Sequence, residues 1–242
     1  AYAIQTLLNK YHLPSLKVLV DLNINSLVVD ILSNMWCEIY KTDLSLKQLS
    51  TEDILRITNN ENGFDITSAE ALDQSTRFYD WLSYEILNSN PDYCFIPFGT
   101  GHLYENILNT NKREITTLEH DPRFQWDLEI LRNANFFGST TNDSTSKADK
   151  LYSPYLPFGH VSEQWIRMYK LAWYCGIRSW IYNFQERYLY EAIDLAKNLS
   201  IQFEPSGIAW LALFLQIQES IPKDKKILII NTWKSKYLDL LL

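Results

Sequence analysis

Cysteine is scarce in this sequence, and the few cysteines are scattered. Of 242 residues only 3 are cysteine, at Cys37, Cys94 and Cys175. An odd and widely spaced set argues against a disulfide framework and is typical of proteins in a reducing compartment, so we expect a cytoplasmic location. The sequence contains neither a CxxC pair nor an HExxH run, so it does not support a zinc site.

Long apolar runs and an excess of basic residues are also missing. The longest apolar stretch, residues 208–217, contains Gln216 and is shorter than the roughly 18 residues of a membrane span, so it predicts a buried helix. The chain has 22 Lys and Arg against 29 Asp and Glu, a net charge of −7. This balance argues against a basic nucleic-acid surface and a polybasic membrane anchor, so we expect no nucleic acid and no membrane as partners.

Apolar and aromatic residues, by contrast, are plentiful. They make up 46% and 14% of the chain respectively, which excludes intrinsic disorder. At roughly 100–200 residues per domain, the length allows one large domain or two small ones.

Short β-branched or aromatic runs alternate with segments whose apolar residues recur at helical spacing. The runs predict strands at residues 17–20, 38–41, 93–97, 115–119, 180–184, 201–204 and 226–231. The other segments predict helices at residues 1–11, 26–35, 51–57, 77–87, 101–108, 124–131, 163–175, 185–198 and 208–219, and the small polar stretch 138–149 predicts a loop. Strands separated by helices imply parallel pairing, so we expect an α/β fold with open, mostly parallel, twisted sheets flanked by helices.

A polar stretch at residues 58–68 interrupts this alternation and predicts a hinge or a loop. In parallel sheets flanked by helices, ligands bind at the carboxyl ends of the strands, so the turns from strand to helix are the expected ligand positions.

Glycine is also scarce, and two of the 7 glycines fall in one such turn. Gly99, Thr100 and Gly101 lie between a predicted strand and a predicted helix, followed by His102 and Leu103. Glycine lets the backbone approach a ligand closely, and backbone amides at a helix N-terminus bind phosphate. The alternative is a plain turn that needs glycine only for its shape.

A second turn, residues 204–207 with the sequence EPSG, lies between a predicted strand and the apolar helix. Ser206 stands where an N-cap residue would be, so the simplest interpretation of this serine alone is helix capping.

The two turns together resemble the fold type II enzymes that depend on pyridoxal phosphate (PLP), the tryptophan-synthase-β-like family. The nearest branch contains threonine synthase, threonine dehydratase and cysteine synthase. Residues 97–102 (PFGTGH) are similar to the family's PxGxGG turn, and residues 204–209 (EPSGIA) to its EPSGA turn. Residues 117–122 (TLEHDP) are similar to a strand that ends in V-E-x-x-P, and residues 146–151 (SKADKL) to S-x-A-D-G-L.

The resemblance implies PLP as the cofactor and a small amino acid as the substrate. It implies that residues 1–62 are part of the smaller, cofactor-covering domain, and that residues 63–242 form the larger domain with the phosphate-binding turn. A neutral hydroxyl beside the pyridine nitrogen favours β- or γ-elimination and replacement over transamination. A homodimer is the default expectation in this family. The cofactor-binding residues implied are Gly99, Thr100, Gly101, His102 and Leu103 for the phosphate and Ser206 for the pyridine nitrogen.

The start of the sequence bears on the catalytic lysine. The predicted helix at residues 1–11 has no capping residue before it and resembles the helix that follows the family's S-G-N turn. The family's Schiff-base lysine precedes that turn, so we expect it upstream of Ala1. No lysine of this sequence matches the catalytic position.

Two departures from the family pattern leave other functions open. His102 replaces the second glycine of the phosphate turn, either as a donor to the phosphate or simply as the first helical residue, and residues 231–234 (NTWK) replace a final T-G-x-G. One alternative is a catalytically inactive PLP-fold protein with a binding or regulatory role. A second is a nucleotide-binding α/β protein that uses the Gly99 turn, although the sequence lacks a GxGxxG run.

Overall fold

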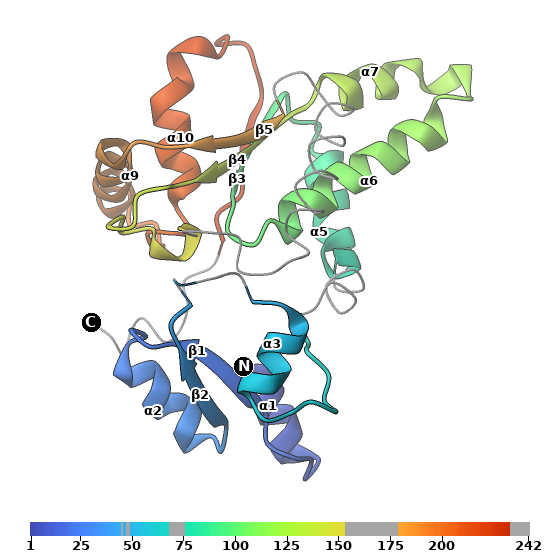
Figure 1. Cartoon of the computed structure of the whole chain (residues 1–242). Helices are drawn as coiled ribbons and strands as arrows, with labels where there is room; N and C mark the ends of the chain where they lie inside the picture. The colour runs from blue at the N-terminus through green and yellow to red at the C-terminus, as the bar shows by residue number, and fades with distance from the viewer. Residues whose placement is uncertain (45, 47–48, 68–75, 153–178, 233–242) are drawn as a thin grey trace. The chain divides into compact units, whose positions relative to one another are not determined.

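The computed structural model describes residues 1–44, 46, 49–67, 76–152 and 179–232. They form two compact units, one of the described residues up to Thr67 and one of those from Thr76 onward (Figure 1). Residues 63–67 group with the first unit, which therefore extends past the boundary expected at residue 62. No helix within the described ranges is long and apolar enough to cross a membrane.

The first unit is built on a parallel pair of strands. Strand β1 pairs with β2 so that Lys17 lies opposite Glu38, and α2 is the crossover that parallel pairing requires. Asn25 caps α2 by accepting from the backbone N–H of Leu27, and Ser50 caps α3. The elements are α1 (Tyr2–Lys10), β1 (Lys17–Asp21), α2 (Ser26–Asn34), β2 (Glu38–Thr42) and α3 (Thr51–Ile57), and all five agree with the predicted ranges within one residue.

A buried glutamine ties α1 to the first strand. Gln5 is fully buried, and its carboxamide accepts a hydrogen bond from the N–H of Leu16 at 2.7 Å and donates one to Asn9 at 2.6 Å. Because an unpaired buried amide is costly, these partners fix the position of α1 against the start of β1.

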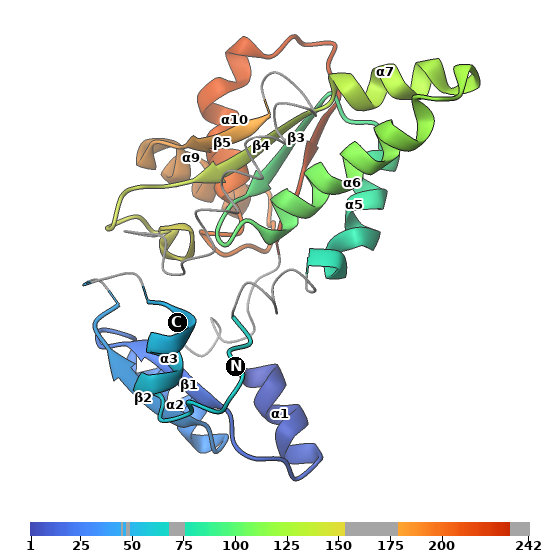
Figure 2. The same ribbon diagram turned by 45° about the vertical axis from the view of Figure 1, so that its right-hand side comes forward.

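The second unit contains a parallel sheet with the strand order β5-β4-β3-β6. Figure 2 shows α5, α6 and α7 on one side of this sheet and α9 and α10 on the other. The strands are β3 (Tyr93–Pro97), β4 (Asn135–Thr140), β5 (Trp180–Asn183) and β6 (Ile227–Ile229). The helices are α5 (Asp80–Asn88), α6 (His102–Leu118), α7 (Gln125–Asn133), α9 (Glu186–Asn198) and α10 (Ala209–Ile217), with 3-10 turns at Thr76–Tyr79, Pro122–Phe124, Asp149–Leu151 and Gln218–Ser220.

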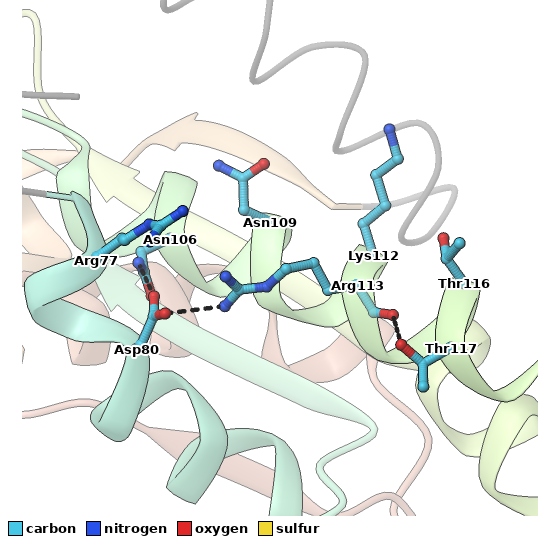
Figure 3. A pocket seen from close by; sticks show the side chains of 8 residues that line it. All are labelled: Arg77, Asp80, Asn106, Asn109, Lys112, Arg113, Thr116 and Thr117. Carbon is cyan, nitrogen blue, oxygen red and sulfur yellow. Dashed lines mark hydrogen bonds and ion pairs between the residues drawn. The ribbon is translucent and has the colours of Figure 1, made fainter. Parts of the chain in front are cut away.

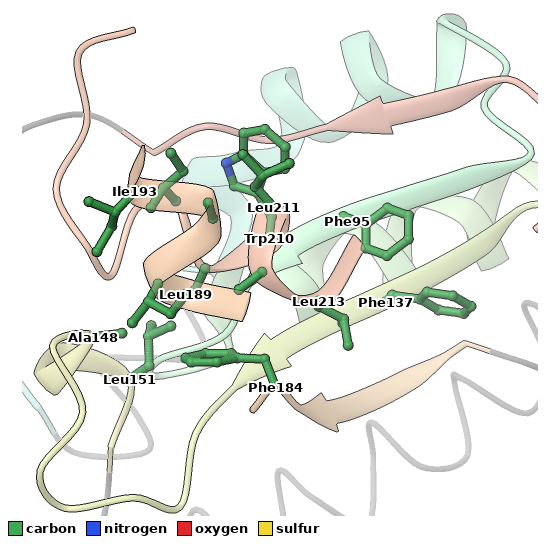
Figure 4. Close-up of a cluster of buried hydrophobic side chains, with 14 of the residues drawn as sticks. Phe95, Phe137, Ala148, Leu151, Phe184, Leu189, Ile193, Trp210, Leu211 and Leu213 are labelled. Atoms are coloured by element: carbon green, nitrogen blue, oxygen red, sulfur yellow. The ribbon is translucent and has the colours of Figure 1, made fainter. Parts of the chain in front are cut away.

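Strand β3 separates two hydrophobic clusters. Cys94 and Ile96 point into the cluster formed with α5, α6 and α7, whereas Tyr93 and Phe95 point into the one formed with α9 and α10. Successive side chains of a strand face opposite sides, so a continuous apolar run is what a strand covered on both faces requires. Figure 4 shows Phe95 in the second cluster.

The strand predicted at residues 115–119 is wrong, because these residues form the last turn of α6 and the segment that follows it. Tyr104, Leu108, Asn111 and Ile115 are all buried, and their spacing of three to four residues is that of one helix face. The resemblance of residues 117–122 to a strand end therefore fails in the structure.

Two further predictions are wrong. The stretch 138–149, predicted as a loop, begins with the second half of β4, where Gly138 leaves room for Phe98: a Cβ on this glycine would lie 3.3 Å from the Phe98 ring. Residues 201–204 are irregular rather than a strand. The helix predicted at residues 163–175 lies outside the described residues.

The core position of Phe95 leads to a first prediction. Its ring is fully buried and makes edge-to-face contacts with Phe137 at 5.2 Å and Phe214 at 5.6 Å between centroids. We expect Phe95→Ala to lower the free energy of unfolding by about 3–5 kcal/mol, measured by urea denaturation. The matched control is Trp126→Ala, because Trp126 is 79% exposed and its loss should change stability by less than about 0.5 kcal/mol. Equal losses in both variants would contradict this packing.

Candidate functional site

The glycine turn lies at the carboxyl end of β3, as predicted. Gly99 and Thr100 are exposed, Gly101 is buried, and His102 and Leu103 are half-buried. Gly101 is the N-cap of α6 and has a φ of 84°, in the left-handed region that glycine adopts without strain. The helix begins at His102, which confirms that this histidine starts the helix.

The backbone amides of this turn are available to a ligand. Among the residues that the structure describes, none accepts a hydrogen bond from the N–H groups of Gly99, Thr100, Gly101 or Leu103. The first amides of a helix have no partner inside the helix, and the helix dipole adds partial positive charge there. The turn thus has the donor set that an anion such as a phosphate group needs.

The side chains of the turn point toward each other. The hydroxyl oxygen of Thr100 lies 3.1 Å from Nδ1 of His102. A hydroxyl and an imidazole both carry hydrogen-bond donors, so the pair can add to the backbone donors of the turn.

Ser206 does not cap the helix that follows it, so the capping interpretation is wrong. The N-cap of α10 is Ile208, with no side-chain hydrogen bond to the helix. Ser206 is 5% exposed as a residue, and its hydroxyl instead accepts a hydrogen bond from the backbone N–H of Lys150 at 3.2 Å.

Lys150 brings the two turns together. A Cβ placed on Gly99 would lie 3.3 Å from the carbonyl oxygen of Lys150, so the backbone of residue 150 packs against the glycine turn. The N–H of the same residue reaches Ser206. The glycine turn and the Ser206 turn, about a hundred residues apart in the sequence, therefore both contact Lys150.

The segment after β6 packs against the second turn, residues 204–207. A Cβ on Gly207 would lie only 2.5 Å from the carbonyl oxygen of Thr232, which no real side chain tolerates without a shift. Thr232, in the stretch that replaces the family's final T-G-x-G, therefore lies against the Ser206 turn. Sequence analysis singled out residues 231–234 only through the family pattern, because no local pattern links Thr232 to Gly207.

A separate polar pocket of about 610 Å³ lies along α6 (Figure 3). Arg113 and Asn106 both donate to Asp80 there, at 3.1 and 2.8 Å. Burial acts to raise the pKa of Asp80, but these two hydrogen bonds, together with the positive charges of Arg113 and Arg77, outweigh it and hold the pKa below its ordinary value. None of the predicted site residues lines this pocket.

The described cysteines have no properties of a nucleophile. Burial raises the pKa of the Cys94 thiol far above its ordinary value and raises that of Cys37. Because the thiolate is the reactive form, both side chains are structural.

Comparison with solved structures identifies the fold. No protein-family model and no curated protein matches the sequence. The structure resembles serine racemase from Dictyostelium discoideum (TM-score 0.59, 15% identity, 95% of this chain and 71% of that one). It also resembles an O-acetylserine-dependent cystathionine β-synthase from Helicobacter pylori (TM-score 0.60, 13% identity, 98% of this chain and 72% of that one). A third similar structure is a hydrogen sulfide-producing enzyme from Fusobacterium nucleatum (TM-score 0.60, 15% identity, 96% of this chain and 74% of that one). These proteins are fold type II PLP-dependent enzymes.

The chain has the fold type II architecture. The resemblance drawn from the two turns is thus confirmed for the fold. In this fold type II sheet the strand that follows β3 along the chain is β4 at Asn135–Thr140, not the segment around residue 117.

The φ of Gly101 generates the second prediction. An L-residue in the left-handed region is strained, so we expect Gly101→Ala to lower the free energy of unfolding by about 1 kcal/mol or more. Asparagine enters this region more readily than alanine, so Gly101→Asn should lose clearly less. Urea denaturation of both variants checks this. If alanine were tolerated as well as asparagine, the left-handed conformation would not be the constraint at this position.

Proposed function

We propose that this chain binds PLP, with the phosphate on the turn from Gly99 to Leu103 and the pyridine nitrogen facing Ser206. The observation that carries the proposal is the contact of both turns with Lys150, because it puts an anion-binding turn and a buried hydroxyl at the same edge of one sheet. The cofactor itself supplies an electron sink for bonds at the α-carbon of an amino acid.

The donors of the turn fit the phosphate. Four amides have no described acceptor, and the Thr100 hydroxyl and His102 imidazole stand beside them. A Cβ on Gly99 would meet the carbonyl oxygen of Lys150 at 3.3 Å and the side chain of Leu151 at 3.6 Å. The role of Gly99 in the proposal is therefore to let the backbone of Lys150 pack closely against the turn.

Ser206 fits the ring nitrogen. Its oxygen already accepts a hydrogen bond from Lys150, and a hydroxyl that accepts one bond still has its own proton to donate. A neutral hydroxyl donates to an unprotonated ring nitrogen, whereas a carboxylate would stabilise the protonated ring. This property favours elimination and replacement over transamination.

We further propose that the substrate is a small amino acid and that the reaction is a β- or γ-elimination or replacement. The similarity to proteins named as serine racemase, L-serine ammonia-lyase and threonine deaminase supports this class. A synthase or dehydratase of the threonine synthase, threonine dehydratase or cysteine synthase type remains our specific proposal. We assign no lysine of this chain to covalent attachment of the cofactor.

Three other parts of the proposal rest on the sequence. The first unit is assigned to the smaller, cofactor-covering domain because its order of elements resembles that part of the family. A homodimer is proposed because it is the family's usual state, and a cytoplasmic location because of the few, scattered cysteines.

Binding of PLP and of pyridoxal, which lacks the phosphate, tests the function. We expect Thr100→Val to weaken PLP binding by about tenfold, since it removes one hydroxyl donor to a charged phosphate group and about 1.4 kcal/mol is tenfold in Kd. Pyridoxal binding should change little. The measurement is titration followed by absorbance and by the ³¹P resonance of the cofactor. Thr116→Val, the same kind of change on α6 in the separate pocket, is the control.

The outcomes separate the alternatives. Equal weakening of PLP and pyridoxal would show that the phosphate does not lie on the Gly99 turn. No binding of PLP by the wild-type chain would refute the proposal. Retention of a nucleotide in place of PLP would favour the nucleotide-binding alternative. PLP binding without any turnover of small amino acids by the full protein would favour an inactive binding protein.

A further inference from the structure

We infer that Lys150 and Glu204 form a positioning pair that holds the Ser206 hydroxyl in place beside the glycine turn. The inference deepens the proposed function and rests on it. It assigns a role to a lysine that replaces the glycine of the S-x-A-D-G-L pattern, and to the glutamate that begins the EPSG turn.

Lys150 makes three separate contacts at this edge of the sheet. Its N–H donates to Ser206 at 3.2 Å, and its carbonyl oxygen packs against Gly99. Its Nζ donates to Oε2 of Glu204 at 2.6 Å in an ion pair. The backbone of Lys150 thus contacts both turns, and its side chain binds Glu204 in the turn that contains Ser206.

The segment that contains Lys150 is anchored on both sides. Ala148 is fully buried and Leu151 is 8% exposed, and Figure 4 shows both beside Leu189 in the second hydrophobic cluster. The carbonyl of Leu151 accepts a hydrogen bond from Thr140 at the end of β4. These anchors hold the segment on the sheet, but none of them reaches the turn of residues 204–207.

The ion pair supplies the link that the anchors lack. The Glu204 side chain is 11% exposed and the Lys150 side chain 53%. The carboxylate is therefore partly shielded from solvent, and its attraction to the lysine is less screened than that of an open surface pair. The Cγ atom of Glu204 also lies 3.2 Å from the position of a Cβ on Gly207, so the glutamate packs directly over the turn.

The consequence concerns the direction of the Ser206 proton. With the Lys150 N–H bound to one lone pair, the rotation of the hydroxyl is restricted and its O–H is directed to another acceptor. Loss of the ion pair releases residue 150 from the turn, lengthens the bond to Ser206 and allows the hydroxyl to rotate. Lys150 and Glu204 act through Ser206 and are positioning residues.

Four variants test the pair. Lys150→Met keeps the length of the side chain without its charge, Glu204→Gln removes the opposite charge, and Lys150→Arg restores a cation. Lys147→Met removes another lysine from the same segment and is the matched control, because the Lys147 side chain stacks on Tyr190 instead. Three measurements apply to each variant: PLP affinity, the ¹⁵N resonance of ring-labelled PLP, and amide hydrogen exchange of the cofactor-free chain.

We expect Lys150→Met and Glu204→Gln each to weaken PLP binding about threefold to fivefold, in the range of a partly exposed ion pair. Both should shift the ring ¹⁵N resonance and raise the exchange rate of the Lys150 amide. Combining the two should add little to either alone. Lys150→Arg and Lys147→Met should resemble the wild type in all three measurements.

The readouts distinguish failure of the inference from failure of the proposed function. Wild-type protein that binds no PLP refutes the function, and the inference with it. Wild-type binding that the variants leave unchanged, with an unshifted resonance, overturns the inference while the function stands. Faster exchange without a shifted resonance shows a purely structural pair and also overturns it. A charge swap, Lys150→Glu with Glu204→Lys, should restore wild-type exchange and resonance, and failure to do so counts against the inference even where single variants unfold.

Discussion

The second unit depends on the burial of β3 between two layers of helices. Its alternating side chains belong to two different hydrophobic clusters, so the strand is held from both faces as well as by β4 and β6 at its edges. Because the neighbouring strands are parallel to it, their carboxyl ends meet at the edge where the glycine turn begins. The position of the candidate site is therefore a consequence of how the core is packed.

Much of this architecture could be predicted from local patterns. The apolar run of β3 followed by two glycines predicts both a strand buried on two faces and a turn open to a ligand. The end of α6 could not be predicted in this way, since its β-branched residues 115–117 favour a strand and the burial of one helix face overrides that preference. The second half of β4 was not predicted because its small polar residues are typical of a loop. Ser139 and Thr140 look like loop residues, yet their hydroxyls donate to the carbonyls of Ala209 and Leu151.

In the candidate site, too, local motifs could be predicted from the sequence and long-range contacts could not. The sequence pattern identifies the glycine turn and Ser206 separately, because each is a local motif. What joins them is a backbone N–H of Lys150, and backbone groups leave no trace in a sequence pattern. For Ser206, its place before a helix suggests an N-cap residue. In the structure its hydroxyl instead accepts a hydrogen bond from Lys150, 56 residues earlier in the chain.

The close approach of Thr232 to Gly207 has a consequence for how the site opens. Strand β6 has three residues and pairs with β3 on one side, so it lies at the edge of the sheet as described. Edges of sheets undergo local opening at a lower free energy than the core. Because Thr232, just after β6, packs against Gly207, local opening of this strand loosens the packing behind the turn that holds Ser206. The stability of a short edge strand thus bears directly on the packing of this side of the site.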